Sequence, residues 1–192
     1  MATIDIGRGK RARAGFGLDD VSIVPSRRTR DADDVDTSWR IDAFSLDLPV
    51  VFLDPPTSDP RGITTVRIDP AAERIDAAAL KDTLAGIDER GGVSAVAIRP
   101  QRAEHLLDDV VSAEPDMVMI LGRVVSAEHV SSTREPLNLK RVIRTLELPV
   151  IVGGCASYPA ALHLMRTGAA GVIIGSDVSA RGVGVPLATA IA

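Results

Sequence analysis

The chain has 192 residues, a formal net charge of −4 at pH 7 and a pI near 5.4. Its apolar fraction of 45% and charged fraction of 25% are typical of one soluble globular domain. The acidic balance argues against nucleic acid as a partner, because phosphate binding needs a clustered positive surface. No apolar run reaches the ~18 residues of a membrane span, and residues 1–15 lack the pattern of a secretory signal. We therefore expect a cytoplasmic protein without membrane contact.

The first quarter of the chain is weakly patterned. Residues 1–15 look irregular, a strand-like stretch follows at 21–24, and an apolar run at 49–53 predicts a buried strand. Basic residues dominate the first thirty positions, and an acidic run follows at 31–36. The basic residues are Arg8, Lys10, Arg11, Arg13, Arg27, Arg28 and Arg30. We interpret the basic stretch as a solvated arm rather than as a phosphate-binding surface.

A regular pattern begins after a proline-rich break at 55–62. Strands are expected at 63–68, 94–98, 117–121, 149–153 and 171–175, and helices at 76–90, 101–113, 138–146, 159–167 and 183–192. Apolar strands that alternate with amphipathic helices predict parallel βα units. A closed (β/α)8 barrel needs eight strands and usually about 250 residues, whereas we count about six strands from Pro49 onward. The sequence thus predicts an α/β fold that resembles an incomplete TIM barrel, either left open or completed by another copy.

We treat residues 1–192 as a single domain with four parts. A basic arm covers 1–20, opening strands cover 21–54, the break covers 55–62, and βα repeats cover 63–192. Cys155 is the only cysteine, so no intrachain disulfide can form. His105, His129 and His163 lie far apart and without ligand spacing, so we predict no metal site.

Three segments of the chain carry the most specific patterns, at 17–51, at 113–130, and at 148–175 together with 181–192. Taken together, they resemble the barrel of the IMP dehydrogenase/GMP reductase family. Residues 17–51 (GLDDVSIVPSRRTRDADDVDTSWRIDAFSLDLPVV) resemble its opening, in which a D-D-V-x-x-V-P element precedes a hairpin and the first barrel strand. Residues 113–130 (AEPDMVMILGRVVSAEHV) are similar to the fourth strand and its loop. Residues 148–175 (LPVIVGGCASYPAALHLMRTGAAGVIIG) and 181–192 (RGVGVPLATAIA) resemble the fifth strand through the sixth helix. Within the family, the likeness is to the bacterial IMP-dehydrogenase-related paralogue.

The resemblance implies purine nucleotide chemistry, but the residues that perform it are replaced. In the family, a cysteine after the sixth strand attacks C2 of IMP or GMP, and NAD or NADP carries the hydride. The corresponding stretch here is GSDVSARG (175–182), which places Val178 where the nucleophile belongs. Valine cannot form the covalent adduct, because a thiolate or similar group must attack. Leu121 and Gly122 stand where the dehydrogenase has an aspartate near the ribose and cofactor.

Other parts of the family pattern are also missing. The segment FLDPPTSDP (52–60) replaces the family's S-A-x-M-D, and the second barrel unit is absent from the pattern. The sequence stops at Ala192, before the seventh and eighth strands and the catalytic flap. We therefore expect no catalytic residues, and no NAD or NADP unless the family activity is retained through other residues.

Cys155 is the remaining candidate nucleophile. It lies at the carboxyl end of the fifth barrel strand, where barrel chemistry takes place, and a nearby helix N-terminus could lower its pKa. No base accompanies it in the sequence, and small buried cysteines at strand ends are common. We favour the structural interpretation.

Glycines at two neighbouring strand ends could hold a phosphate. The candidate nucleotide-binding residues are Gly153, Gly154, Gly175 and Ser176, because glycine permits close backbone approach and a helix N-terminus follows the first pair. Asp177 argues against this, since it places a negative charge where the phosphate would lie. The same glycines could simply form tight βα turns.

Three hypotheses follow. The chain is a catalytically silent family member that associates with itself or with another protein and retains some purine mononucleotide binding. Alternatively, it is an active purine nucleotide oxidoreductase, of IMP dehydrogenase or GMP reductase type, that uses non-standard residues. The third hypothesis is a decayed gene product, against which the clean alternation of strands and helices argues.

Overall fold

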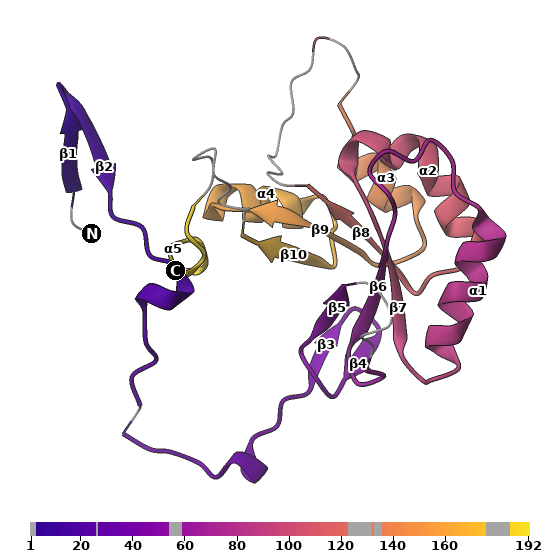
Figure 1. Ribbon diagram of the computed structural model, residues 1–192, viewed down its shortest axis with the longest axis horizontal. Coiled ribbons are helices and arrows are strands. Elements are labelled where there is room, and N and C mark those ends of the chain that lie inside the picture. The colour runs from indigo at the N-terminus through magenta and orange to yellow at the C-terminus, as the bar shows by residue number, and fades with distance from the viewer. Residues whose placement is uncertain (1–2, 26, 54–58, 123–131, 133–135, 176–184) are drawn as a thin grey trace.

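A six-stranded parallel sheet forms the centre of the protein. The computed structural model describes residues 3–25, 27–53, 59–122, 132, 136–175 and 185–192. The sheet has the order β10-β9-β8-β7-β6-β5 and curls like part of a barrel (Figure 1). Its strands are β5 (Val51–Leu53), β6 (Ile63–Arg67), β7 (Val93–Ile98), β8 (Met117–Leu121), β9 (Val150–Cys155) and β10 (Gly171–Ile174). The predicted α/β fold, an incomplete (β/α)8 barrel of about six strands, is confirmed.

Helices cover the outer, convex face of the sheet. They are α1 (Ala77–Asp88), α2 (Pro100–Ser112), α3 (Leu139–Thr145) and α4 (Tyr158–Arg166), and a short α5 (Leu187–Ile191) follows β10. Three of them begin at a side chain that caps the backbone: Asp76 for α1, Asn138 for α3 and Ser157 for α4. None of the described helices is both long and apolar enough to cross a membrane.

Each face of the sheet has its own apolar cluster. Strand residues alternate between the faces, so β8 sends Val118 and Ile120 to the outer cluster and Met117 and Met119 to the inner one. The outer cluster includes the buried faces of α1, α2 and α4. The inner, concave face is covered by an antiparallel hairpin, β3 (Trp39–Ile41) and β4 (Phe44–Leu46). Both hairpin strands are short, and their buried residues Ile41 and Leu46 complete the inner cluster.

Three predictions for the first quarter of the chain were wrong. Residues predicted to be irregular form a second antiparallel hairpin, β1 (Thr3–Gly7) and β2 (Lys10–Arg13). The stretch 21–24, predicted as a strand, forms none, because no other described segment pairs with it. The run at 49–53, predicted to be buried, supplies the edge strand β5, whose Val51 and Leu53 are exposed because only β6 pairs with it among the described residues.

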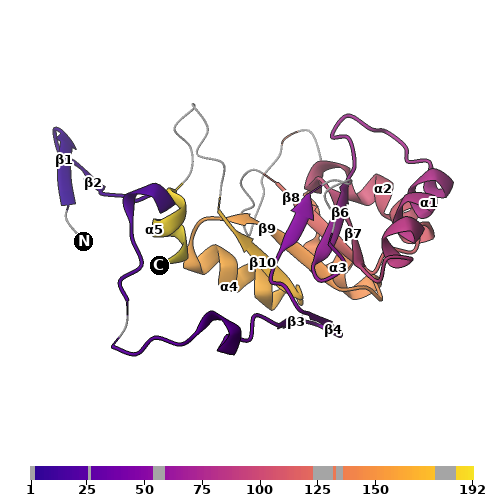
Figure 2. The same cartoon turned by 60° about the horizontal axis from the view of Figure 1, so that its bottom comes forward.

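Residues 3–38, hereafter the arm, leave the body of the protein. None of its described residues is buried. The arm contains β1, β2 and two short 3-10 turns at Leu18–Asp20 and Ala32–Asp34. Figures 1 and 2 both show β1 and β2 apart from the sheet, on the side of α5 and at the opposite end from α1 and α2. The arm meets α5 where the Phe16 amide donates to Thr189 Oγ1 at 2.7 Å.

Candidate functional site

The carboxyl ends of the strands form the edge at which barrel proteins of this kind place their chemistry. Five neighbouring strands bring different residues to it. Strand β6 ends at Arg67, β7 is followed by Arg99, β8 by Gly122, β9 ends at Cys155, and β10 is followed by Gly175. This edge therefore contains all the described residues that the sequence analysis nominated.

The two central glycines are held by their neighbours on both sides. The Gly154 amide donates to the Gly122 carbonyl at 3.0 Å, and the Gly122 amide donates to the Gly153 carbonyl at 2.7 Å. On the other side, the Gly175 amide donates to the Cys155 carbonyl at 2.7 Å. These bonds use the single N–H of Gly154 and of Gly175, so neither group is left for a phosphate oxygen.

Close packing explains why glycine stands at these positions. A Cβ atom on Gly154 would collide with the Gly175 carbonyl oxygen, and one on Gly153 would lie 2.7 Å from the Ile173 carbonyl oxygen. Gly153 and Gly154 are both buried. The space that a phosphate cradle would offer to a ligand is filled here by the backbone of β10 and its extension. Gly175 itself has φ +120°, a conformation that favours glycine.

The fourth nominated residue, Ser176, lies outside the described residues, as do Asp177 and Val178. The assignment of a phosphate to this glycine set stays a prediction. The contacts of Gly153, Gly154 and Gly175 assign to these three residues a packing role.

Cys155 is placed away from the concave face. Its side chain is 1% exposed and belongs to the outer cluster, together with Val152 and Leu164. The thiol lies 3.6 Å from the Ile173 carbonyl oxygen, and burial raises its pKa. A nucleophilic cysteine needs an accessible thiolate and a lowered pKa. The geometry therefore agrees with the structural interpretation of this residue.

Two arginines at this edge were missed by the sequence analysis. Arg67 is paired in register with Ala97, which belongs to the inner cluster, so the alternation of strand residues places Arg67 on the concave side. Arg99 follows the last residue of β7 and precedes α2. Both are exposed. An arginine directly after a buried apolar run is the signal that could have indicated them. In the described parts of the chain, no cluster of three or more potential metal ligands occurs.

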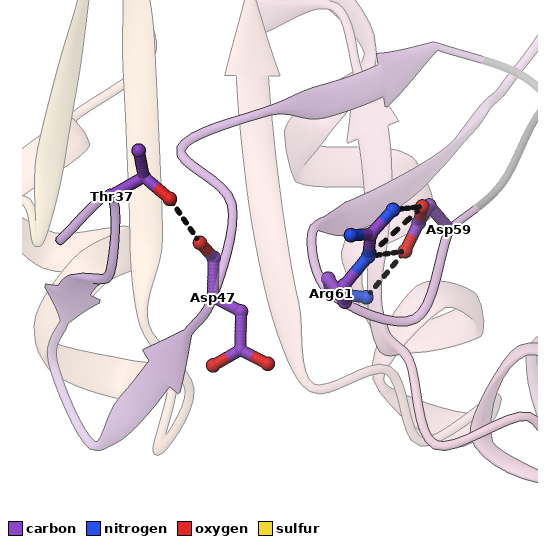
Figure 3. Close-up of polar contacts among 4 residues, drawn as sticks. All are labelled: Thr37, Asp47, Asp59 and Arg61. Carbon is purple, nitrogen blue, oxygen red and sulfur yellow. Dashed lines mark hydrogen bonds and ion pairs between the residues drawn. The ribbon is translucent and has the colours of Figure 1, made fainter. Parts of the chain in front are cut away.

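A second polar region lies at the opposite, amino edge of the sheet. Ser45, Asp47, Arg61 and Gly91 contribute to an open depression of about 320 Å³ there. Arg61 is bound to Asp59 at 2.6 Å, and this pairing lowers the pKa of Asp59 to about 2 (Figure 3). Thr37 Oγ1 donates to the Asp47 carbonyl at 3.0 Å and so joins the end of the arm to the residue that follows β4. Since the amino edge of a barrel serves stability rather than chemistry, we assign these contacts a structural role.

Known proteins show which class this architecture resembles. No protein-family model matches the chain. A crystal structure of an IMP dehydrogenase/GMP reductase-like protein from Corynebacterium glutamicum superimposes with a TM-score of 0.79 at 31% identity, covering 98% of this chain and 62% of that protein. The chain thus has an IMP dehydrogenase/GMP reductase-like fold.

Curated relatives give a consistent picture. Proteins from Mycobacterium bovis and Mycobacterium tuberculosis, each described as an uncharacterized oxidoreductase, are 36% identical over 98% of this chain. The counterpart from Mycobacterium leprae is 34% identical. The chain spans 64% of the length of these relatives. The alignment runs over 245 positions, more than the 192 residues of the chain, so the relatives also carry residues inside the matched region that this chain lacks.

Proposed function

We propose that this protein is a shortened member of the IMP dehydrogenase/GMP reductase family that does not catalyse hydride transfer and works by association. The partner is a second copy or a longer relative. The similarity to the Corynebacterium glutamicum protein over 98% of the chain supports the family. The alignment with the mycobacterial relatives runs over 245 positions, more than the 192 residues of the chain, and this supports the shortening.

One observation carries the proposal of catalytic silence. At the carboxyl edge, the only thiol of the chain is buried in the outer cluster, and the amides of Gly154 and Gly175 are bonded internally. Covalent chemistry at C2 of a purine needs an accessible nucleophile. The described part of this edge offers arginine side chains, which can bind an anion, and packed glycine backbone, which supports the sheet. Neither group is a nucleophile.

The free edges of the sheet support association. The outer edges of β5 and β10 have no partner strand among the described residues. Val51, Leu53 and Ile174 on these strands are 37%, 52% and 42% exposed. An exposed parallel edge with apolar side chains is a surface that native proteins usually cover. Another chain that lies against either edge would bury these side chains.

Residual binding of a purine mononucleotide belongs to the same proposal. The phosphate would need cationic or backbone donors, and Arg67 and Arg99 are exposed arginines at the carboxyl edge. The amides of Gly154 and Gly175 are bonded internally and leave no donor for a phosphate there. We therefore assign no step of hydride transfer with a nicotinamide cofactor to these residues.

Two assays test this proposal. The purified chain is incubated with IMP and NAD, and with GMP and NADPH, while the nicotinamide absorbance is followed; we expect no change above the buffer control. Thermal unfolding is then measured with millimolar IMP, GMP, XMP and ATP. Ligand at 100 times its Kd stabilises by about 2.7 kcal/mol, so a shift specific to purine monophosphates would support retained binding. Turnover that scales with protein concentration would contradict catalytic silence.

The second candidate is an active purine nucleotide oxidoreductase. The description of the mycobacterial relatives as oxidoreductases favours it. This candidate requires a reactive group from outside the described carboxyl edge, because Cys155 is buried there. Turnover by the wild-type chain separates the two candidates, and turnover that survives Cys155→Ala would show that another group performs the chemistry.

A further inference from the structure

The outer edge of β5 is apolar and uncharged. Outside the arm, eight large apolar side chains are exposed among the described residues, and three of them lie within four consecutive residues. These three are Val50, Val51 and Leu53, which are 39%, 37% and 52% exposed. Charged side chains are one means by which native sheets keep an edge from pairing with another chain, and residues 48–53 have none. Pro49 precedes β5 and so leaves the amides within the strand intact.

Part of the β5 backbone is directed away from the sheet. The Ile63 amide donates to the Val50 carbonyl at 3.0 Å, and Val51 is paired in register with Ile63. In a parallel ladder the bonds to one neighbour come from alternate residues, so Val50 and Phe52 are the residues that bond to β6. The amides and carbonyls of Val51 and Leu53 therefore point outward, where a further strand could accept and donate.

The side chains of β5 are partly covered on both faces of the sheet. Ile63 belongs to the inner cluster, so its partner Val51 lies on the concave face, and Leu53 lies there too. Phe52 lies on the other face and is half-buried. One added strand would lie beside all three side chains, because its own residues alternate between the two faces in the same way.

The other outer edge of the sheet, that of β10, is less open. Leu187 of α5 lies 3.1 Å from the position that a Cβ atom on Gly175 would occupy, so α5 packs against the residue that follows β10. The arm is bonded to α5 through Phe16 and Thr189. Figure 1 shows α5 at the β10 end of the sheet, away from β5. Of the two edges, β5 is therefore the one with more room for another chain.

Two β5 strands that run antiparallel would complete one another. With a twofold axis at Phe52, Val51 of one copy lies opposite Leu53 of the other, and these are the residues whose amides and carbonyls point outward. Each such pair exchanges both of its N–H···O bonds, while Phe52 lies opposite Phe52 in the closer position without hydrogen bonds. A twofold interface uses the same surface of both copies, and an edge without charge does not repel its own copy.

We propose that β5 pairs antiparallel with β5 of a second copy of this chain, about a twofold axis at Phe52. This inference rests on the proposed association and names its partner, its edge and its register. The sheets of the two copies then continue into one another, and the apolar side chains at the joined edges are covered.

Cysteines introduced into the full-length chain test the register. Residues that lie opposite each other in a position without hydrogen bonds have Cα atoms about 4.5 Å apart, which a disulfide can bridge. We expect Phe52→Cys, oxidised with diamide, to form a covalent dimer at least about tenfold faster than Ile174→Cys, because paired thiols react at a high effective concentration. Ile174 on β10 is 42% exposed and serves as the matched control. The wild type, whose only cysteine is buried, supplies the background rate.

Charge placed on the strand gives a second test that leaves Phe52 in place. In Val51→Lys/Leu53→Lys, like charges face each other across the two strands, so sedimentation velocity is expected to show self-association about tenfold weaker than that of the wild type. A mixture with Val51→Glu/Leu53→Glu is expected to form a heterodimer, because each lysine then faces a glutamate. The matched control, Val111→Lys/Met165→Lys, replaces side chains of similar exposure on α2 and α4 and is expected to associate like the wild type.

The inference and the proposed function fail in different ways. If the wild type associates while Phe52→Cys does not cross-link and the lysine variant associates equally well, another surface joins the copies, and the inference alone is overturned. Faster cross-linking of Ile174→Cys would assign the contact to the edge of β10 and would also overturn it. A wild type that stays monomeric at every concentration would overturn the inference together with self-association.

Discussion

The carbonyl oxygen of Gly175 fills the position that a Cβ atom on Gly154 would occupy. The two residues belong to neighbouring strand ends, and the Gly175 amide is bonded to the Cys155 carbonyl one residue beyond Gly154. The paired glycines thus allow β9 and the end of β10 to approach more closely than any side chain would permit. This contact makes the glycines part of the packed core at the edge where the sequence suggested a ligand.

Substitution of Gly154 by alanine tests the packing role. Because the added methyl group meets backbone on the neighbouring strand end, we expect Gly154→Ala to lower the free energy of unfolding by about 1–3 kcal/mol or more. Urea denaturation followed by circular dichroism measures this change. Gly86 inside α1 is the matched control, since its Cβ position is 3.9 Å from Arg90 and otherwise open. Gly86→Ala is expected to stabilise by about 0.5–1 kcal/mol. Equal stability of the two variants would contradict the packing role.

Thr64 contains a buried hydroxyl whose loss should help the fold. Its Oγ1 has no hydrogen-bond partner among the described residues, and the side chain is 1% exposed. Valine has nearly the same shape and needs no partner, so Thr64→Val is expected to raise the free energy of unfolding by about 1 kcal/mol. The control is the adjacent Thr65→Val, which removes the contact of Thr65 Oγ1 with Met119 Sδ at 3.6 Å and should gain less. A loss of stability in Thr64→Val would show that the hydroxyl has a partner.

Asp88 should destabilise the protein at neutral pH. Burial, and then the charge of Asp116, raise its pKa above the ordinary value of an aspartate, despite a hydrogen bond from Ser94. The folded state therefore holds this proton more tightly than the unfolded state, and stability falls as pH rises through the interval between the two pKa values. We expect Asp88→Asn to be more stable than the wild type at pH 7, with a difference that vanishes at pH values below about 4. Thermal unfolding across pH measures this difference, and one that is independent of pH would contradict the electrostatic cause.

Cys155 should react slowly in the folded protein. Its thiol is 1% exposed and burial raises its pKa, so both access and thiolate content are low. We expect alkylation by iodoacetamide at pH 8 to be at least about a hundredfold slower in the folded protein than in denaturant. The reagent reaches the thiol only when the structure opens locally. Free cysteine supplies the reference rate. Labelling as fast as in the unfolded chain would place the thiol at the surface and reopen its role as a nucleophile.

The βα repeats could be predicted from sequence because their local and long-range preferences agree. The strand at 117–121 matches β8 residue for residue, and the helix expected at 101–113 is α2 shifted by one position. Apolar periodicity and capping residues such as Asp76 and Ser157 mark these elements within a few residues. Burial of the apolar faces in the core then favours the same strands and helices that the apolar periodicity predicts.

The first quarter of the chain could not be predicted in the same way. In the β1–β2 hairpin, only β1 alternates, at Ile4 and Ile6, whereas Ala12 is the one apolar residue of β2. Its turn contains Gly9, which has φ +70°. The run at 49–53 has the composition of a buried strand, but burial depends on a second neighbour that local pattern does not encode.

The role of the nominated glycines could not be read from sequence. Gly153 and Gly154 are consistent with either a ligand cradle or close backbone packing, and only the position of Gly175 distinguishes them. The face on which Cys155 lies was also undetermined. The register with β10 shifts between Ile173 and Ile174, and Cys155 joins Val150 and Val152 on the outer face.

The measurement that most directly tests catalytic silence is nicotinamide absorbance during prolonged incubation of the wild-type chain with IMP and NAD, or with GMP and NADPH. We expect a rate equal to that of the buffer control at every protein concentration. A rate that rises in proportion to protein concentration would contradict it.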